Sequence, residues 1–176
     1  RPQRLEAEIV RDVIMTASGG IDLTVGGPPI FPHVPDEILA SRLYGRWDNQ
    51  DDGPDAWRRS VYVYRLRSRV FPFFETFDLP DQNVTSAARN VSTVPTQALT
   101  LMNNPFVLNQ AGLLAERVER MAPNSLDDQI NLSYLLTLSR TPSTEEAAIA
   151  RGLVEHGSLS DLAHVLFNLN EFLYLR

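Results

Sequence analysis

The sequence lacks two reactive side chains altogether, because its 176 residues include no cysteine and all 16 of its basic residues are arginine. Without a thiol, the chain has no disulfide, no cysteine nucleophile, no zinc–thiolate site and no attachment point for a thioether-linked haem. Without a lysine amine, it has no Schiff-base nucleophile and no phosphate-binding lysine of a Walker-type loop. The nucleophile-elbow, metalloprotease and dinucleotide-binding motifs are missing as well. We therefore assign no catalytic residue, and the exclusions favour a protein that is not an enzyme.

Long apolar runs and a surplus of basic charge are also missing. No apolar run approaches the roughly 20 residues of a membrane span, so we expect no such span. The formal net charge is −6 and the pI is near 5.0, whereas a protein that binds the phosphate backbone carries a net basic face. The arginines from Arg58 to Arg69 follow a run of aspartates, and we expect the two groups to neutralise each other. We therefore expect no nucleic-acid partner.

The length of the chain suits one domain, because a chain of this size can bury about 70% of its surface. We predict a single domain over residues 1–176. Its first part, residues 1–94, should be a helix plus long loops, and residues 95–176 should form a helical array. The sequence starts at Arg1 without a signal peptide. We therefore expect an excised C-terminal part of a larger protein.

The first part is predicted to begin with an amphipathic helix. From Arg4 to Ser18, apolar residues recur at the helical spacing, and Gly19 and Gly20 then offer a left-handed cap. The polar residues that fall largely on the opposite face are Glu6, Glu8, Arg11 and Asp12.

A proline-rich segment separates this helix from a candidate strand. Residues 21–35 hold four prolines, which deny the backbone a donor, so they should form a loop. Residues 60–64 combine β-branched and aromatic residues, which is typical of a short strand. Such a strand needs a partner, which we place near residues 23–25 as a short β-hairpin.

The second part carries the start signals of successive helices. Pro95 and the pair Asn104–Pro105 suit the first turns of two of them. The segment from Ser143 to Glu146 is a full capping box, and shorter versions begin at Ser125 and Ser158. Because short connectors place successive helices antiparallel, we predict a mainly α fold with an antiparallel helical bundle in this half.

The helix over residues 125–138 is predicted to be the central one. Its apolar residues nearly encircle it, as expected of a helix that is buried all round. We expect its core positions to be Tyr134, Leu135 and Leu138.

The candidate metal ligands form incomplete sets. Residues 48–53 begin like a calcium loop, but its twelfth position is Arg59, where such a loop needs a bidentate glutamate. The three histidines, His33, His156 and His164, are far apart, and none has a second histidine at metal spacing. We therefore expect no metal site and no cofactor in this chain.

One stretch, residues 77–99, concentrates polar groups between hydrophobic anchors. Two interpretations remain open. Either Asp81 acts as a base or ligand anchor beside Arg89, or these groups form the turns and caps of an ordered loop. In the second case, Asp81 and Arg89 should bind backbone groups or one another. The candidate binding or structural cluster consists of Arg58, Arg59, Asp78, Asp81, Arg89, Asn90, Gln97 and Asn103.

Six segments resemble a known family. They are RLEAE (4–8), GGP (26–28), RRSVY (58–62), FDLPD (77–81), RNVSTVPTQALTLMN (89–103) and NEFLY (170–174). On these segments the chain resembles the C-terminal half of the planctomycete cytochrome-associated domain of unknown function. Such domains close large exported bacterial proteins that also carry a cytochrome-c-like haem module. The resemblance implies a periplasmic or extracellular location and a parent protein with haem c elsewhere, and it implies no reaction.

Two functions from different classes follow. The first is a non-catalytic helical interaction or assembly module of the large exported haem-containing protein; its partners are the other domains of that protein, or another protein or a polysaccharide. The alternative is an enzyme or glycan-handling domain with a polar cleft around Asp78, Asp81, Arg89 and Asn90. The two differ in whether these side chains converge on a solvent-filled pocket or bind backbone groups.

Overall fold

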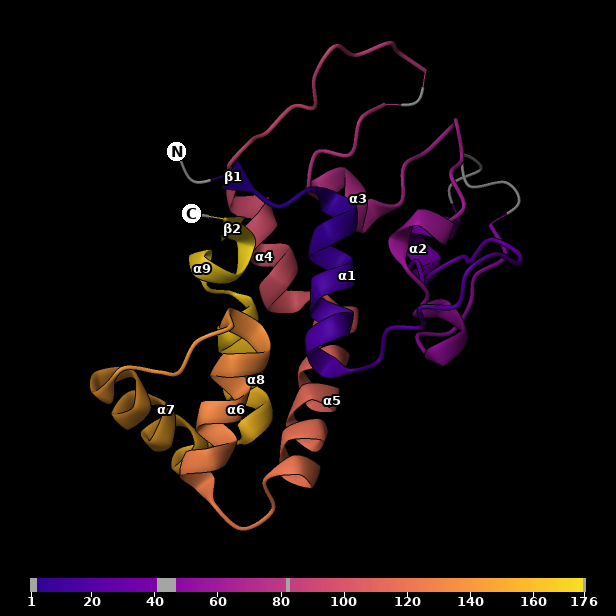
Figure 1. The fold of residues 1–176 in the computed structure, drawn as a ribbon. Coiled ribbons are helices and arrows are strands. Elements are labelled where there is room, and N and C mark those ends of the chain that lie inside the picture. Colours follow the sequence, from indigo (N-terminus) through magenta and orange to yellow (C-terminus); the bar gives the residue numbers. More distant parts are fainter. Residues whose placement is uncertain (1–2, 41–46, 82, 176) are drawn as a thin grey trace. The chain divides into compact units, whose positions relative to one another are not determined.

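The structure, a computed structural model, describes residues 3–40, 47–81 and 83–175. In this part of the chain, helices dominate and the strands form one two-stranded sheet (Figure 1). The predicted mainly α fold is confirmed. The chain divides into two compact units, to both of which the helices α1 (Ala7–Ser18) and α4 (Pro95–Asn103) contribute. Unit 1 comprises residues 3–5, 13–20 and 101–175, and unit 2 comprises residues 6–12, 21–40, 47–81 and 83–100.

Unit 1 is built mainly from helices that follow one another along the chain. They are α5 (Pro105–Met121), α6 (Leu126–Leu138), α7 (Thr144–His156), α8 (Leu159–Phe167) and the short α9 (Asn170–Leu173). α5 and α8 pack against each other, and α6 packs against both (Figure 1). The helical bundle predicted for this half is confirmed.

The predicted start signals form the caps of these helices. Ser143 Oγ accepts a hydrogen bond from Glu146 N at 3.2 Å, and the Glu146 carboxylate accepts one from Ser143 N at 2.7 Å, which completes the capping box. The hydroxyls of Ser125 and Ser158 accept the N–H three residues further on. Asn104 caps α5 through its amide oxygen. Four helices therefore begin where the sequence pattern placed them.

The buried centre of unit 1 lies at α5 and α8, so the prediction that α6 is the central helix is wrong. Of the predicted core positions, Tyr134 is buried, but Leu135 is 51% exposed and Leu138 is only half-buried. Because α6 is apolar nearly all round, its pattern does not indicate which face turns inward. Large apolar side chains of α5 and α8 that are almost fully buried are Val107, Leu114, Val118, Leu162, Leu166 and Phe167.

Helix α1 ends in the predicted glycine cap. Gly19 has a φ of 80°, and Gly20 N donates to Met15 O at 3.0 Å. Arg117 of α5 donates to two carbonyl oxygens of the last turn of α1, at 3.0 and 2.7 Å. These bonds satisfy carbonyl groups that a helix end leaves without an intrahelical partner.

The only sheet in the described part of the chain joins its two ends. β1 (Gln3–Arg4) pairs antiparallel with β2 (Tyr174–Leu175), and Gln3 lies opposite Leu175. The neighbouring Leu5 N donates to Leu173 O at 2.8 Å. Both strands belong to unit 1.

Unit 2 has little regular structure. Its own elements are α2 (Asp36–Leu39), α3 (Pro72–Thr76) and two 3-10 turns (Pro54–Ala56 and Ser60–Tyr62). The expected strand at residues 60–64 and its β-hairpin are therefore not found. Isolated parallel bridges join Asp22 to Arg58 and Ile30 to Val63 instead. Prolines in the facing segment remove backbone donors, so single bridges form and a continuous ladder does not.

The core of unit 2 is aromatic. Phe73, Phe74 and Phe77 are almost fully buried. Phe71 meets Phe74 edge-on with 5.2 Å between ring centroids, and it stacks on Trp47 at 6.0 Å. Such pairs add to the stabilisation from burial alone. They give a loop-rich unit a packed centre.

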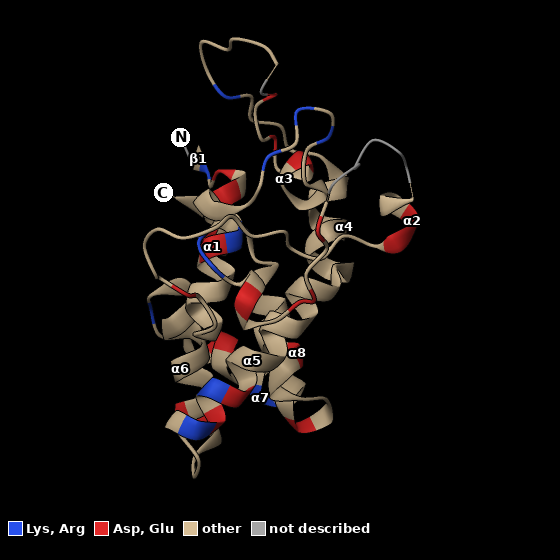
Figure 2. Cartoon of the chain, turned by 90° about the vertical axis from the view of Figure 1, so that its right-hand side faces the viewer, with Lys and Arg blue, Asp and Glu red and all other residues tan. Residues whose placement is uncertain are grey.

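Charges of both signs are interspersed along the ribbon (Figure 2). No helix within the described ranges has both the length and the apolar character that crossing a membrane requires.

Candidate functional site

The structure separates the eight predicted polar residues into several groups. Asp78, Asp81 and Asn90 line one depression of unit 2, which we call the loop pocket and which has a volume of about 430 Å³. Asn103 belongs to unit 1, at the end of α4. The other residues that line the loop pocket are Glu75, Leu79, Pro80, Val84 and Ser86.

Asp78 closes the long loop that precedes α4. Its φ of 61° is left-handed, a conformation that aspartate tolerates better than most residues. Its carboxylate accepts hydrogen bonds from Ser92 N and Ser92 Oγ, both at 2.8 Å. The buried Gln97 donates through Nε2 to Thr76 O at 3.1 Å and to Ser92 O at 3.3 Å. Together Asp78 and Gln97 hold the two ends of the loop together.

Asp81 is exposed and supports a turn. Its Oδ1 accepts from Asn83 N at 2.8 Å and from Asn83 Nδ2 at 3.0 Å, and Asn83 Nδ2 also donates to Arg67 O at 2.9 Å. This is the local side-chain-to-backbone bonding expected of aspartate in a turn. The bond from Asn83 N to Asp81 therefore agrees with the structural interpretation.

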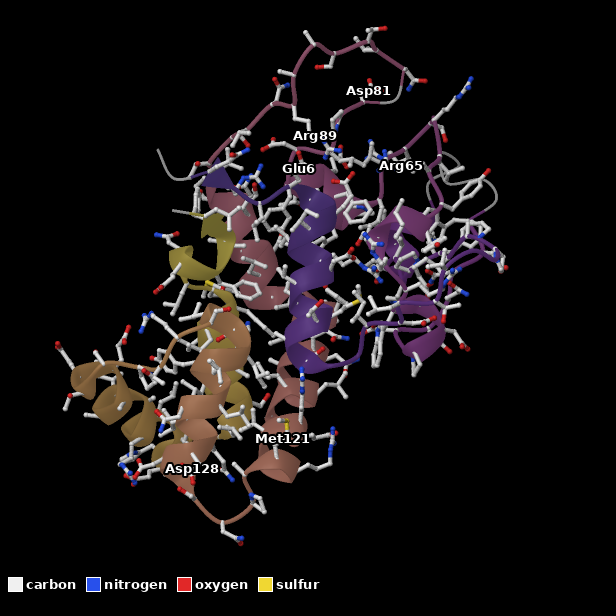
Figure 3. The ribbon with its side chains drawn as sticks, viewed as in Figure 1. Glu6, Arg65, Asp81, Arg89, Met121 and Asp128 are labelled. Carbon is white, nitrogen blue, oxygen red and sulfur yellow. The ribbon has the colours of Figure 1, made fainter. Side chains whose placement is uncertain are left out.

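Arg89 binds two carboxylates at the start of α1, that of Glu8 in its first turn and that of Glu6 just before it. Its guanidinium donates to both oxygens of Glu8, at 2.7 and 3.3 Å, and lies 3.2 Å from Glu6. Arg65 reaches Glu8 as well, at 2.8 Å. Figure 3 shows Glu6, Arg65 and Arg89 gathered near the start of α1, with Asp81 further out on the loop. Arg89 was expected to bind backbone groups or Asp81, so its carboxylate partners are a finding of the structure.

The cluster predicted from the sequence did not include Glu6, Arg65 or Glu8, and Glu8 is the residue that binds both arginines. Burial acts to raise its pKa, but the hydrogen bond from Arg89, a backbone hydrogen bond at Glu8 itself and the charges of Arg89 and Arg65 together outweigh burial, so the pKa lies below its ordinary value. The same contact with Glu8 raises the pKa of Arg89. Because Glu8 and Arg89 are 81 residues apart in sequence, no local spacing links them.

Arg58 organises a separate cluster. Only 8% exposed, it donates to Pro28 O at 2.6 Å, to Thr24 O at 3.1 Å and also to Gly26 O. Its guanidinium lies 3.9 Å from the centroid of the Tyr62 ring. The neighbouring Arg59 is exposed. Arg58 therefore holds the glycine- and proline-rich loop of residues 24–28 and is not among the described lining residues of the loop pocket.

Arg11 was expected on the polar face of α1, but it is buried, with only 1% of its surface exposed. It donates to Arg58 O at 3.0 Å, to Ser60 Oγ at 3.3 Å and to Ala56 O at 2.6 Å. Burial lowers the pKa of Arg11 to about 10, against the opposing effect of nearby aspartates. A guanidinium can be buried here because loop carbonyls accept its hydrogen bonds.

The acidic segment that begins like a calcium loop is used for loop packing. The side chain of Asn49 bonds both backbone groups of Val34, at 2.8 and 3.1 Å. Asp52 accepts from Trp57 Nε1 at 2.6 Å. In the part of the chain that the structure describes, no three His, Asp or Glu side chains are placed to hold a metal ion.

The polar groups that line the loop pocket are mainly hydrogen-bond acceptors. Three carboxylates, those of Glu75, Asp78 and Asp81, line it together with the amide of Asn90 and the hydroxyl of Ser86. Such a lining suits hydroxyl or cationic groups, and it does not suit an anion because no arginine is among the described lining residues.

Comparison with known families identifies the chain. The profile of the family described as "PSD1: Protein of unknown function (DUF1553)" matches residues 1–154. The chain belongs to the PSD1 family. The matched range contains both the loop pocket and the Arg58 cluster, so both lie within the part that is PSD1. The predicted resemblance to a domain of unknown function is confirmed, whereas its planctomycete and cytochrome associations stay predictions.

No curated protein and no solved structure matches the chain.

Proposed function

We propose that the chain is a non-catalytic interaction module that helps to assemble a larger protein. The observation that carries this proposal is the bonding of the pocket carboxylates, because Asp78 and Asp81 accept hydrogen bonds from backbone N–H groups of their own loop. Carboxylates bound in this way support loop structure. A general base must instead be aimed at a substrate proton.

We further propose that the larger protein is exported, bacterial and haem-containing. The support is the resemblance of the six segments to the planctomycete cytochrome-associated domain. The haem belongs to another domain, since a thioether-linked haem needs cysteines and this chain has none. The partners of the module are then the other domains of the same protein.

The test is association in solution. The chain and the rest of its parent protein are expressed as separate polypeptides, mixed, and analysed by size-exclusion chromatography and titration calorimetry. We expect a one-to-one complex with a Kd of about 1 μM or tighter, which corresponds to about −8 kcal/mol. Separate elution and no heat at about 100 μM, a concentration that would populate even a weak domain contact, would contradict the proposal.

The volume and lining of the loop pocket favour a second candidate, an enzyme or glycan-handling domain. Carboxylate and amide groups would bind the hydroxyls of a neutral saccharide there. A glycan array followed by calorimetry tests this candidate. Asp81→Asn combined with Asn90→Ala should weaken saccharide binding about tenfold or more, whereas Asp128→Asn on α6 of unit 1, an exposed aspartate outside the pocket (Figure 3), should not. An array without any bound saccharide would eliminate the candidate.

A further inference from the structure

Residues 83–91 form the outer part of the long loop before α4, and all of them are exposed. Val84 and Val91 expose 65% and 61% of their surface. None of these nine residues belongs to a helix or a strand. The segment is therefore held by a few side-chain contacts, which makes it a candidate for local opening.

The contacts at the base of the loop differ in kind from the contact in its outer part. At the base, Ser92 is half-buried and binds Asp78 through two donors at 2.8 Å. In the outer part, Arg89 binds Glu8 and Glu6, and the Arg89 side chain is 38% exposed. Hydrogen bonds at a half-buried base are little affected by salt, whereas an ion pair open to solvent is screened by it. Rising ionic strength therefore weakens the outer contact before the base.

The outer contact also shapes the loop pocket. Val84, Ser86 and Asn90 line the pocket from residues 83–91, and Arg89 is the immediate neighbour of Asn90. Glu75, Asp78 and Asp81 line it from the segment before. Because Arg89 adjoins Asn90, its ion pair with Glu8 anchors this wall beside the start of α1.

We propose that residues 83–91 are a strap that forms one wall of the loop pocket, and that the ion pair of Arg89 with Glu8 holds the strap closed in an ionic-strength-dependent manner. Glu8 is suited to this role because it also binds a second cation, Arg65, which keeps its carboxylate in place, while the side chain of Arg89 is 38% exposed and within reach of salt. The strap does not depend on which molecule, if any, enters the pocket. It therefore stands or falls independently of the proposed function.

Native-state proteolysis tests the strap. Thermolysin, which cuts before apolar residues, is applied to the whole chain at about 10 mM and at about 1 M NaCl, where charges are screened over about 30 and 3 Å. Cutting within residues 83–91 is followed by mass spectrometry and normalised to the unfolded chain at the same salt. When opening is fast, this rate tracks the population of the open form. We expect it to rise about fivefold with salt, the equivalent of about 1 kcal/mol.

Substitutions at Glu8 and Arg89 test whether their ion pair is the contact that responds to salt. Arg89→Gln should be cut at low salt as fast as the original chain is cut at high salt, and it should lose the salt dependence. Glu8→Gln should also be cut faster at low salt, but it keeps the contact of Arg89 with Glu6 and should lose only part of the salt dependence. Arg89→Gln changes an exposed residue only and keeps the test usable if Glu8→Gln fails to fold. The matched control is Glu116→Gln, which removes an exposed ion pair with Arg120 on α5 and should change neither rate nor salt dependence. An Arg89→Gln chain that keeps the original rate or salt dependence would overturn the proposal, and so would equally faster cutting along the whole chain.

Discussion

Units 1 and 2 satisfy their buried backbone groups in different ways. In unit 1, the helices pair most N–H and C=O groups internally, and serine and asparagine side chains complete the helix ends. In unit 2, the described segments between the short helices pair at isolated bridges and through single backbone bonds, and arginine side chains donate to further carbonyl groups. The carbonyl oxygens that accept from Arg11 or Arg58 belong to Thr24, Gly26, Pro28, Ala56 and Arg58.

This difference shows why arginine suits a loop-rich fold. A guanidinium has five N–H donors in a fixed plane, so one side chain can bind carbonyl groups of several loop segments. An ammonium group is a compact point charge and cannot reach them all. Stability should therefore depend on single buried arginines in unit 2 and on many shared apolar contacts in unit 1.

The sharpest test of the comparison is Arg11→Ala. Removing this buried guanidinium leaves several buried acceptors without a donor, so we expect the free energy of unfolding to fall by about 3–5 kcal/mol. Urea denaturation followed by tryptophan fluorescence measures it, because both tryptophans of the chain, Trp47 and Trp57, lie in unit 2. The exposed Arg120→Ala in unit 1 is the control and should stay within about 0.5 kcal/mol. Equal effects of the two substitutions would break the comparison.

The next effect concerns the apolar centre of unit 1. Leu114→Ala creates a cavity at a fully buried position of α5, and we expect it to lower the free energy of unfolding by about 2–5 kcal/mol. Leu135→Ala on α6 removes a half-exposed side chain, so its effect should be below about 1 kcal/mol. Thermal unfolding followed by far-UV circular dichroism compares the two. A larger loss at Leu135 would return α6 to the centre of the unit.

Arg58→Lys probes geometry at constant charge. A lysine at this position keeps one donor group but cannot bind three loop carbonyls, so we expect a loss of about 1–3 kcal/mol. The adjacent and exposed Arg59→Lys should be neutral within about 0.5 kcal/mol. If Arg58→Lys leaves the free energy of unfolding unchanged in the same fluorescence assay, the positive charge alone holds the loop, and the several N–H donors of the guanidinium are not needed.

The smallest effect is a pH dependence in unit 1. The hydrogen bonds from Arg140, and next those from Ser143, lower the pKa of Glu146 from 4.5 to about 2. A carboxylate whose pKa falls on folding stabilises the fold above its unfolded pKa, and this contribution disappears as the pH drops from about 4.5 towards 2. Because Glu146 is about one-third exposed, we expect a loss below about 1 kcal/mol. Chemical denaturation across this range should show that the free energy of unfolding depends less on pH in Glu146→Gln than in the original chain. An equal pH dependence in both would refute the role of Glu146.

The sequence predicted unit 1 far better than unit 2, for a physical reason. Helix starts are local, since Ser143 and Glu146 meet within one turn, and their types and spacing suffice. The face that α6 turns inward is decided by packing against α5 and α8, and a helix that is apolar all round does not encode it. The caps were therefore predicted correctly, whereas of the three expected core positions of α6 only Tyr134 is buried.

The candidate site was predicted only where its bonds are local. Asp78, Asp81 and Asn90 were singled out within one stretch, and the structure brings all three to the loop pocket. Glu8 and Arg11 are on α1, and their partners lie 45 to 81 residues away. Charged residues on an amphipathic helix are ordinarily solvated, so nothing in the spacing separates a buried arginine from an exposed one.

The pairing of β1 with β2 has a consequence for how the chain could be re-engineered. Because Gln3 lies opposite Leu175, these two residues, far apart in sequence, are held about 5 Å apart, the spacing of paired strands. Such closely spaced ends favour circular permutation, with the old ends joined by a short linker and new ends opened elsewhere.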